Sequence, residues 1–518
     1  MAARIKLAFV FLFLLLMACK ETTTKKELEP SQEQSYKEKY RPQFHFSPSE
    51  KWMNDPNGLV YHDGIYHLFY QYYPDDIVWG PMHWGHAISK DLVFWEHKPI
   101  ALFPDEHGYI FSGSAVVDTE NTSGLGSAGK PPLVAIFTYH DINGEQAGKT
   151  DFQTQGIAFS LDNGESWEKY SGNPVIGNDG IKDFRDPKVF WHEASQKWIM
   201  ILVAGDHAKF YNSSNLKEWE LMSEFGKEHG AHGGVWECPD LFPLKVDDEG
   251  PEKWVLTISI NPGAPNGGSG TQYFIGDFDG TSFKTDQEET LWLDWGTDNY
   301  AGITYNNHPN DERVFIGWMS NWAYARDTPT EKWRSAMTVP RNLELRKIGD
   351  KMTLVNYPIE SFGTIFKSGV KKDVNLASGT KDSIPFEHYN QAEIRFTTTA
   401  RDFVLNFKNV LNEELVLTMD STQKTFLLDR VASGKTDFQA DFGSKIHQMP
   451  IENLPQEEYE VRILIDWSSV EVFINEGQYV MTAQIFPNEP YTMLNISNPS
   501  QAEVILSDLE VNVAESIW

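Results

Sequence analysis

Three acidic residues beside prolines are the strongest candidates for chemistry in this sequence. Asp55 lies in the segment WMNDPNG, Asp186 in FRDP and Glu237 in ECPD. Proline biases the residue before it to extended backbone, so carboxylates in such segments can be held rigidly. A single Asp-Pro is most often a structural turn, but each of these acids also has Trp, Phe or Arg close by. Two converging carboxyl groups with aromatic side chains for sugar stacking indicate glycoside hydrolysis.

The residues around these acids indicate which of them is the nucleophile and which is the proton donor. In a retaining glycosidase the two carboxyl groups stand about 5–5.5 Å apart; one attacks the anomeric carbon and the other protonates the leaving oxygen. Apolar walls and a neighbouring negative charge favour a proton donor, which suits Glu237 between Trp236 and Cys238. Asp55, on a tight polar turn, is the better nucleophile.

Repeated elements must bring these residues together. Residues 41–345 contain short strand-like runs broken by turns, and a Ser/Asp turn before an aromatic residue recurs at 89–96, 160–168 and 213–220, with a weaker copy at 277–283. The copies are about 60 residues apart, which is typical of four-stranded β-propeller blades. We therefore predict a five-bladed propeller, in which acids distant in sequence converge at one axis.

The pattern changes after about residue 345. Tryptophan becomes rarer, and alternating strands such as 403–407 and 461–466 appear at short spacing, which predicts a β-sandwich over 366–518. Residues 346–365 are predicted to be the linker. The expected fold class is all-β, with a five-bladed propeller followed by a C-terminal sandwich.

Composition narrows the class of ligand. The chain has 518 residues, of which 40% are hydrophobic and 13% aromatic, and its formal net charge is −30. Such an acidic chain repels a phosphate backbone, so we expect no nucleic-acid partner, whereas a neutral sugar fits. Cys19 and Cys238 are the only cysteines, which excludes a disulfide framework and a Cys-built zinc site. His83 and His86 lack an evident third ligand, so we expect neither metal nor cofactor.

The N-terminus is typical of an export signal. Arg4 and Lys6 precede an apolar run over 7–17, which is too short to span a bilayer but suits a signal peptide over 1–18. The run ends in Leu-Met-Ala before Cys19, which resembles a lipobox, so we expect lipidation of Cys19 and anchoring in a bacterial cell envelope; ordinary secretion is the alternative. Residues 19–40 are polar and predict a flexible tether.

Several segments together resemble glycoside hydrolase family 32, the β-fructofuranosidases. They are WMNDPNG at 52–58, FSGSA at 111–115, FRDPKV at 184–189 and ECPD at 237–240. WGHA at 84–87, WRSAMTVPR at 333–341 and SSVEVF at 468–473 match too. The resemblance follows the family's order from about residue 44 to 490.

The resemblance implies retaining hydrolysis of fructosyl linkages in fructans such as levan and inulin, fructo-oligosaccharides or sucrose. Asp55 would form a fructosyl-enzyme, Glu237 would be the general acid/base, and Asp186 would stabilise the transition state. The residues expected to bind the terminal fructose are Trp52, Asn54, Gln71, Trp79, Phe111, Ser112, Arg185 and Trp322.

Other functions remain open at this point. The segment SLDNGESW at 160–167 is similar to the Asp-box of sialidases, but a sialidase needs an arginine cluster and a Tyr nucleophile. A fructan-binding lipoprotein without catalysis is a second alternative, which the presence of all three acids disfavours. Endo cleavage of levan or inulin, and transfer of fructose to another sugar, use the same chemistry and the same residues.

Overall fold

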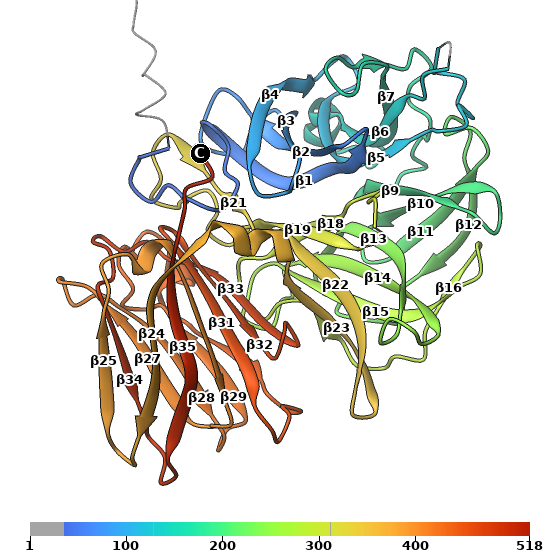
Figure 1. The fold of residues 1–518 in the computed structure, drawn as a ribbon. Coiled ribbons are helices and arrows are strands. Elements are labelled where there is room, and N and C mark those ends of the chain that lie inside the picture. Colours follow the sequence, from blue (N-terminus) through green and yellow to red (C-terminus); the bar gives the residue numbers. More distant parts are fainter. Residues whose placement is uncertain (1–35, 128, 311) are drawn as a thin grey trace, which may run out of the picture.

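The computed structural model describes residues 36–127, 129–310 and 312–518. It consists of two all-β bodies, which lie side by side in Figure 1: a ring of sheets from blue to yellow, and a sandwich in orange and red. The predicted signal peptide, Cys19 and most of the tether lie outside the described residues. Within the described ranges, no helix is long and apolar enough to cross a membrane.

Five sheets form the propeller, which confirms the predicted number of blades. Their strand orders are β20-β1-β2-β3-β4, β5-β6-β7-β8, β12-β11-β10-β9, β13-β14-β15-β16 with β17, and β18-β19-β22-β23 with β21. The strands are β1 (Lys51–His62), β2 (Ile65–Tyr73), β3 (His83–Ser89), β4 (Trp95–Leu102), β5 (Tyr109–Val117), β6 (Leu133–His140), β7 (Gln153–Ser160), β8 (Glu168–Lys169), β9 (Phe184–His192), β10 (Lys197–Ala204), β11 (Ala208–Ser213), β12 (Glu220–Phe225), β13 (Val235–Lys245), β14 (Glu252–Asn261), β15 (Gly270–Phe278), β16 (Phe283–Lys284), β17 (Leu291–Trp292), β18 (Tyr300–Thr304), β19 (Val314–Met319), β20 (Trp333–Arg334), β21 (Ala336–Met337), β22 (Arg341–Ile348) and β23 (Lys351–Pro358).

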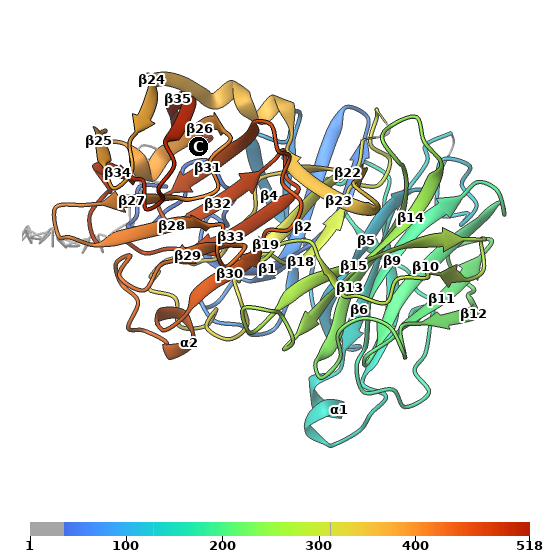
Figure 2. The ribbon, with the colours of Figure 1, turned by 90° about the horizontal axis from the view of Figure 1, so that it is seen from below.

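The first strands of the five sheets surround the axis. Each of β1, β5, β9, β13 and β18 packs against its neighbours in the ring. The ring is closed by a parallel pairing of β20 with β1, in which Lys51 faces Trp333 and Trp52 faces Arg334. A short helix, α1 (Ile142–Gln146), extends from the loop between β6 and β7 and is visible at the bottom of Figure 2.

The recurring turn seen in the sequence has the same place in three blades. It joins β3 to β4, β7 to β8 and β11 to β12. In each copy the serine that ends the inner of the two strands donates a hydrogen bond to the Asp or Asn two residues later: Ser89 to Asp91 at 3.1 Å, Ser160 to Asp162 at 2.8 Å and Ser213 to Asn215 at 3.2 Å. The Asp-box-like segment at 160–167 is therefore a turn element of the blade.

The C-terminal body is a sandwich of two six-stranded sheets with orders β24-β35-β26-β31-β32-β33 and β25-β34-β27-β28-β29-β30. Its core is formed by the inward side chains of both sheets, such as Phe403, Leu405, Val461 and Ile463. The strands and short helices are β24 (Phe366–Leu376), β25 (Lys381–Pro385), β26 (Ala392–Thr398), β27 (Phe403–Lys408), β28 (Glu414–Asp420), β29 (Thr425–Asp429), β30 (Ile446–Pro450), β31 (Tyr459–Asp466), β32 (Ser469–Ile474), β33 (Tyr479–Gln484), β34 (Met493–Ser497), β35 (Val504–Ala514), η2 (Glu360–Ile365), η3 (Tyr389–Gln391) and α2 (Ala440–Gly443).

Two predicted boundaries differ from the structure. The predicted linker 346–365 largely belongs to the fifth blade, because β22 and β23 pair along their whole length across a turn at Gly349, which has a φ of +62°. Only η2 remains as the connection to β24. The end of the predicted tether is not flexible: Tyr36 stacks on Trp518 with ring centroids 4.0 Å apart, and Tyr40 is buried, because the aromatic rings of both residues pack against the folded body.

A buried ionic network joins the two bodies. Arg341 of β22 is fully buried and contacts Asp294 at 3.0 Å, Asn356 at 2.9 Å and Glu471 of the sandwich at 3.3 Å. It also donates to the hydroxyl of Thr482 at 2.6 Å. One guanidinium therefore neutralises carboxylates from both sides of the interface.

Replacing Arg341 should loosen this interface. Arg341→Ala leaves the buried carboxylates of Asp294 and Glu471 without their cation, and breaking a buried pair in this way costs about 3–5 kcal/mol. We expect a lower midpoint in urea unfolding followed by tryptophan fluorescence. Arg395→Ala is the control, because Arg395 pairs with Glu460 at the surface, where ion pairs contribute about 0–1 kcal/mol. Equal midpoints for the two variants would show that the network does not hold the bodies together.

Candidate active site

The three predicted acids meet at one end of the propeller axis. Asp55 lies in β1, Asp186 in β9 and Glu237 in β13, each in the first half of an inner strand. The thiol sulfur of Cys238 is 3.6 Å from a carboxylate oxygen of Asp55 and 3.6 Å from one of Asp186. Ring closure thus brings together residues that are far apart in the chain.

A β-bulge at the same place in every inner strand aims these side chains. Relative to the adjacent strand, each inner strand has one extra residue, between Met53 and Pro56, Ile110 and Gly113, Arg185 and Lys188, Glu237 and Asp240, and Tyr300 and Ile303. A bulge bends the strand and re-aims a side chain. Inside three of them a residue other than glycine has left-handed backbone: Asp186 at φ +62°, Cys238 at +45° and Ala301 at +53°. Such strain is found where function requires a fixed geometry.

Asp55 is held from two strands. One carboxylate oxygen accepts a hydrogen bond from the Ser112 hydroxyl of β5 at 2.6 Å, and the other accepts from the Asn54 amide at 2.9 Å. The Asn54 oxygen in turn accepts from the Trp52 indole at 2.7 Å. Burial and the negative charge of Glu237 raise the pKa of Asp55, although the bonds from Ser112 and Asn54 oppose this rise.

Asp186 is the most enclosed of the three acids. Its side chain is buried, and one oxygen accepts the backbone N–H of Cys238 at 3.0 Å. Burial raises the pKa of Asp186; Arg185 opposes the rise, while the charges of Glu237 and Asp55 add to it. The carboxyl group is therefore fixed by the blade beside it and shares its electrostatics with the other two acids.

The carboxylate of Glu237 accepts hydrogen bonds from the blades on both sides. Arg185 donates to one carboxylate oxygen at 3.0 Å, and the Tyr300 hydroxyl of β18 donates to the other. Arg185 is itself held by Asp183 at 2.8 Å. Arg185, Glu237 and Tyr300 are the first residues of the bulges in three consecutive blades, which explains why they lie side by side.

Aromatic side chains surround the acids. The ring of Trp322 stacks on Trp52 with centroids 5.9 Å apart, and Trp79 meets Phe111 edge-on at 6.1 Å. Phe111 lies flat on His140 at 4.2 Å. Trp79, Phe111 and Trp322 are half-buried and offer ring surface to a ligand, as sugar binding requires.

Some of the residues predicted to bind sugar have almost no exposed surface. Trp52 is fully buried and supports Asn54 and Trp322, and Asn54 has 3% of its surface exposed. Gln71 has 2% exposed, and its amide donates to Asn57 at 2.8 Å and to the Ile110 carbonyl at 3.0 Å. These side chains support the residues that face the axis.

Two contacts were missed from the sequence. Tyr300 lies outside every recognised motif, and its equivalence to Glu237 at the start of a bulge is visible only in the structure. In the sequence, Cys238 is evident only as a neighbour of Glu237, whereas its sulfur is 3.6 Å from carboxylate oxygens of two of the acids. Burial raises the pKa of its thiol strongly, and the nearby carboxylates add to the effect, so it remains a thiol.

His83 and His86 are occupied elsewhere. His83 lies 2.9 Å from the Pro81 carbonyl oxygen, and His86 pairs with His67 at 3.1 Å. Among the described residues, no group of three His, Cys, Asp or Glu side chains is placed to hold a metal ion.

The chain is similar to known enzymes along nearly its whole length. A levanase from Bacillus subtilis (strain 168) is 44% identical over 93% of this chain and 72% of the relative. An extracellular exo-inulinase from Aspergillus awamori is 42% identical over 88% of this chain and 91% of the relative. The crystal structure of exo-inulinase from Aspergillus awamori has a TM-score of 0.85 at 39% identity, and covers 93% of this chain and 100% of that one.

Family models agree with these similarities. The N-terminal domain of glycosyl hydrolases family 32 matches residues 45–358, and the C-terminal domain of the same family matches residues 364–513. The chain therefore belongs to glycosyl hydrolase family 32 and is a glycoside hydrolase.

Proposed function

We propose that this protein is an exo-acting β-fructosidase, which releases terminal β-fructosyl units from fructans, fructo-oligosaccharides or sucrose. The observation that carries the proposal is the convergence of Asp55, Asp186 and Glu237 at one ring-lined end of the axis. The names of the relatives, levanase and exo-inulinase, support both the fructan substrate and the exo action.

Asp55 is the nucleophile in this proposal. Ser112 and Asn54 each bind one of its oxygens, so the carboxylate is fixed in orientation before substrate arrives. It attacks the anomeric carbon of the fructosyl unit and forms a covalent fructosyl-enzyme. Asp186, held rigid in its bulge, accepts hydrogen bonds from sugar hydroxyls and stabilises the positive charge that develops in the transition state.

Glu237 is the general acid and then the general base. It gives a proton to the leaving oxygen, and the resulting carboxylate takes a proton from the water that hydrolyses the intermediate. Arg185 and Tyr300 each bind one of its oxygens and so fix the direction of proton transfer. Arg185 also stabilises the carboxylate formed after the first step.

Localisation rests on the sequence alone. The apolar run before Cys19 and its resemblance to a lipobox support export followed by lipid anchoring in a bacterial cell envelope.

The first test is product analysis with Asp55→Asn as the decisive variant. The unmodified protein should release free fructose as the first product from inulin, levan or sucrose, measured by chromatography of early time points. Asp55→Asn should lower kcat at least about a thousandfold, because the covalent path is lost. Asp63→Asn, at the exposed turn after β1, should retain full activity. Oligosaccharides as first products would contradict exo action. If Asp55→Asn keeps a tenth or more of the unmodified rate, Asp55 is not the nucleophile.

The resistance of Asp55→Asn to urea, measured as a function of pH, is a second test. Because the pKa of Asp55 is raised above 3.8 in the folded protein, ionisation destabilises the fold as pH rises through the folded pKa. The variant lacks this penalty, so it should resist urea better than the unmodified protein at pH 7 and lose that advantage below about pH 4. Loss of activity with lower stability at pH 7 would instead indicate misfolding.

The loss of activity in Glu237→Gln should depend on the leaving group of the substrate. An activated aryl fructoside needs no proton donor, so its first step should be far less impaired than cleavage of inulin or sucrose. Azide needs no general base and should restore turnover of the aryl substrate, giving a β-fructosyl azide detectable by mass spectrometry. Asp55→Asn should give no β-product with azide. Identical responses of the two variants would overturn the assigned roles.

Cys19→Ala should release the protein from membranes. Without the thiol there is no site for the lipid, so the protein should move from the membrane pellet to the soluble fraction after ultracentrifugation. Thr24→Ala is the matched control and should stay in the pellet. Continued membrane association of Cys19→Ala would require another anchor.

A further inference from the structure

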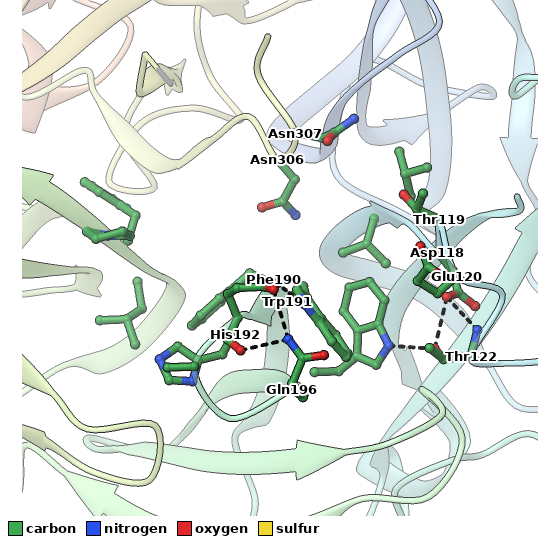
Figure 3. Close-up of a pocket in the computed structure, with 18 of the residues that line it drawn as sticks. Asp118, Thr119, Glu120, Thr122, Phe190, Trp191, His192, Gln196, Asn306 and Asn307 are labelled. Atoms are coloured by element: carbon green, nitrogen blue, oxygen red, sulfur yellow. Dashed lines mark hydrogen bonds between the residues drawn. The ribbon is translucent and has the colours of Figure 1, made fainter. Parts of the chain in front are cut away.

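A cavity of about 870 Å³ lies at the opposite end of the propeller axis from the acids (Figure 3). Its walls come from the last residues of β5 and β9, the middle of β13, the start of β14 and the segment after β18. On β9, Asp186 and His192 are six residues apart, or about 20 Å of extended strand. The cavity is therefore separate from the site described above, and we call it the back pocket.

Aromatic rings form one side of the back pocket. Phe190, Trp191 and Trp254 line it and are half-buried, so part of each ring is open to a ligand. The Trp191 indole donates to Glu193 at 2.8 Å, and its ring meets Trp198 edge-on at 5.1 Å. These contacts fix the ring before any ligand binds, which reduces the entropy lost on binding.

Polar groups beside the rings are also fixed. Asp118 accepts the backbone N–H groups of Thr122 and Ser123, both at 2.8 Å, and the Thr122 hydroxyl accepts from the Trp198 indole at 2.8 Å. Asn306 closes the inner end, where its amide donates to the carbonyls of Ala115 at 2.8 Å and Val189 at 3.0 Å. Figure 3 shows Thr122 and Asn306 on different sides of the cavity.

Charge limits the class of ligand. The back pocket is lined by the carboxylates Asp118, Glu120, Glu193 and Glu252 and by one cation, Arg313. This surplus of negative charge, on a chain of net charge −30, disfavours phosphates, sugar acids and nucleotides. Neutral amides and hydroxyls from Gln196, Asn306, Asn307 and Thr119 complete the lining. Flat rings and neutral hydrogen-bonding groups in one cavity suit a neutral sugar chain.

We propose that the back pocket is a second, non-catalytic binding site for a neutral oligosaccharide, in which Trp191 and Trp254 pack against sugar rings. The volume lies within the range of about 300–1,000 Å³ typical of ligand sites. The choice of a fructan chain as occupant rests on the proposed function. A polymer held at the back pocket stays near the enzyme while its ends are cleaved at the other end of the axis, which raises the effective concentration of substrate.

Equilibrium dialysis with an inulin-type pentasaccharide tests the proposal. The Asp55→Asn protein, which does not consume the probe, should bind two molecules per chain at saturation. Adding Trp191→Ala should weaken the second site at least tenfold. Adding Thr119→Trp fills the cavity from its exposed wall and should also leave one bound molecule, without removing any ring from the core. Adding Phe94→Ala, an exposed aromatic residue elsewhere on the propeller, should leave both sites.

The outcomes separate this proposal from the proposed function. One bound molecule in Asp55→Asn whose affinity Trp191→Ala leaves unchanged, or two that persist in both pocket variants, would overturn the back pocket as a sugar site. Binding of spermidine, but not of the pentasaccharide, in a Trp191-dependent manner would show that the carboxylates select a cation instead. If the unmodified protein releases no fructose from the pentasaccharide while Trp191-dependent binding persists, the proposed function fails and the binding site stands. Circular dichroism of each variant checks folding.

Discussion

The mutual repulsion of three carboxyl groups at the propeller axis is the constraint on which this structure depends. Asp55, Asp186 and Glu237 share one partly buried space, and Arg185 contacts both Asp186 and Glu237. Burial and neighbouring charge raise the pKa of Asp55 and of Asp186, so these two acids keep a proton more readily than separate carboxyl groups would. The same repulsion destabilises the folded state at neutral pH, so the surrounding blades must be rigid enough to hold the acids together.

That rigidity comes from ring closure and from the sandwich packed beside the closing point. β20 pairs with β1 at Lys51 and Trp52, directly before the chain of hydrogen bonds that runs from Trp52 through Asn54 to Asp55. The sandwich supports this region through buried charges. Burial lowers the pKa of His45, but its contacts with Asp466 at 2.9 Å and Glu471 outweigh burial and raise the pKa to about 9. His45 is therefore a cation at neutral pH and, with Arg341, balances the carboxylates of the interface.

Local patterns in the sequence predicted the strands, the blades and the three acids. The features that these patterns missed depend on how separate strands and blades pack against one another. Proline-flanked acids, the recurring Ser/Asp turn and alternating strands are local signals, so the acids, the five blades and the sandwich could be predicted. The linker was wrong because β23 carries none of the tryptophans used to follow the propeller, although its pairing with β22 is regular. Tyr300 was missed because its role follows from a bulge in register with that at Glu237, and register between blades has no short-range signal. The resemblance to the family placed Trp52 among the sugar-binding residues, since a shared motif cannot distinguish a ring that faces sugar from one that supports it.

The interior of the axis explains how its two ends can differ in chemistry. Lys188 and Asp240 are both buried between them, with the amine 3.1 Å from the carboxylate, and the amine also donates to the Thr304 carbonyl at 2.6 Å. One Asp240 carboxylate oxygen accepts from the Thr304 backbone at 2.6 Å and from its hydroxyl at 2.8 Å, whereas the other oxygen is buried without a hydrogen-bond partner. This buried pair separates the acids from the back pocket. Because its two charges are opposite, it adds little net charge at either site. The inner strands therefore pass from a strained, negatively charged end, where bulges aim carboxylates, through the buried Lys188–Asp240 pair to an end lined by rings. Because this pair lies between the two ends, a ligand can bind at the second end without disturbing the geometry that cleavage requires.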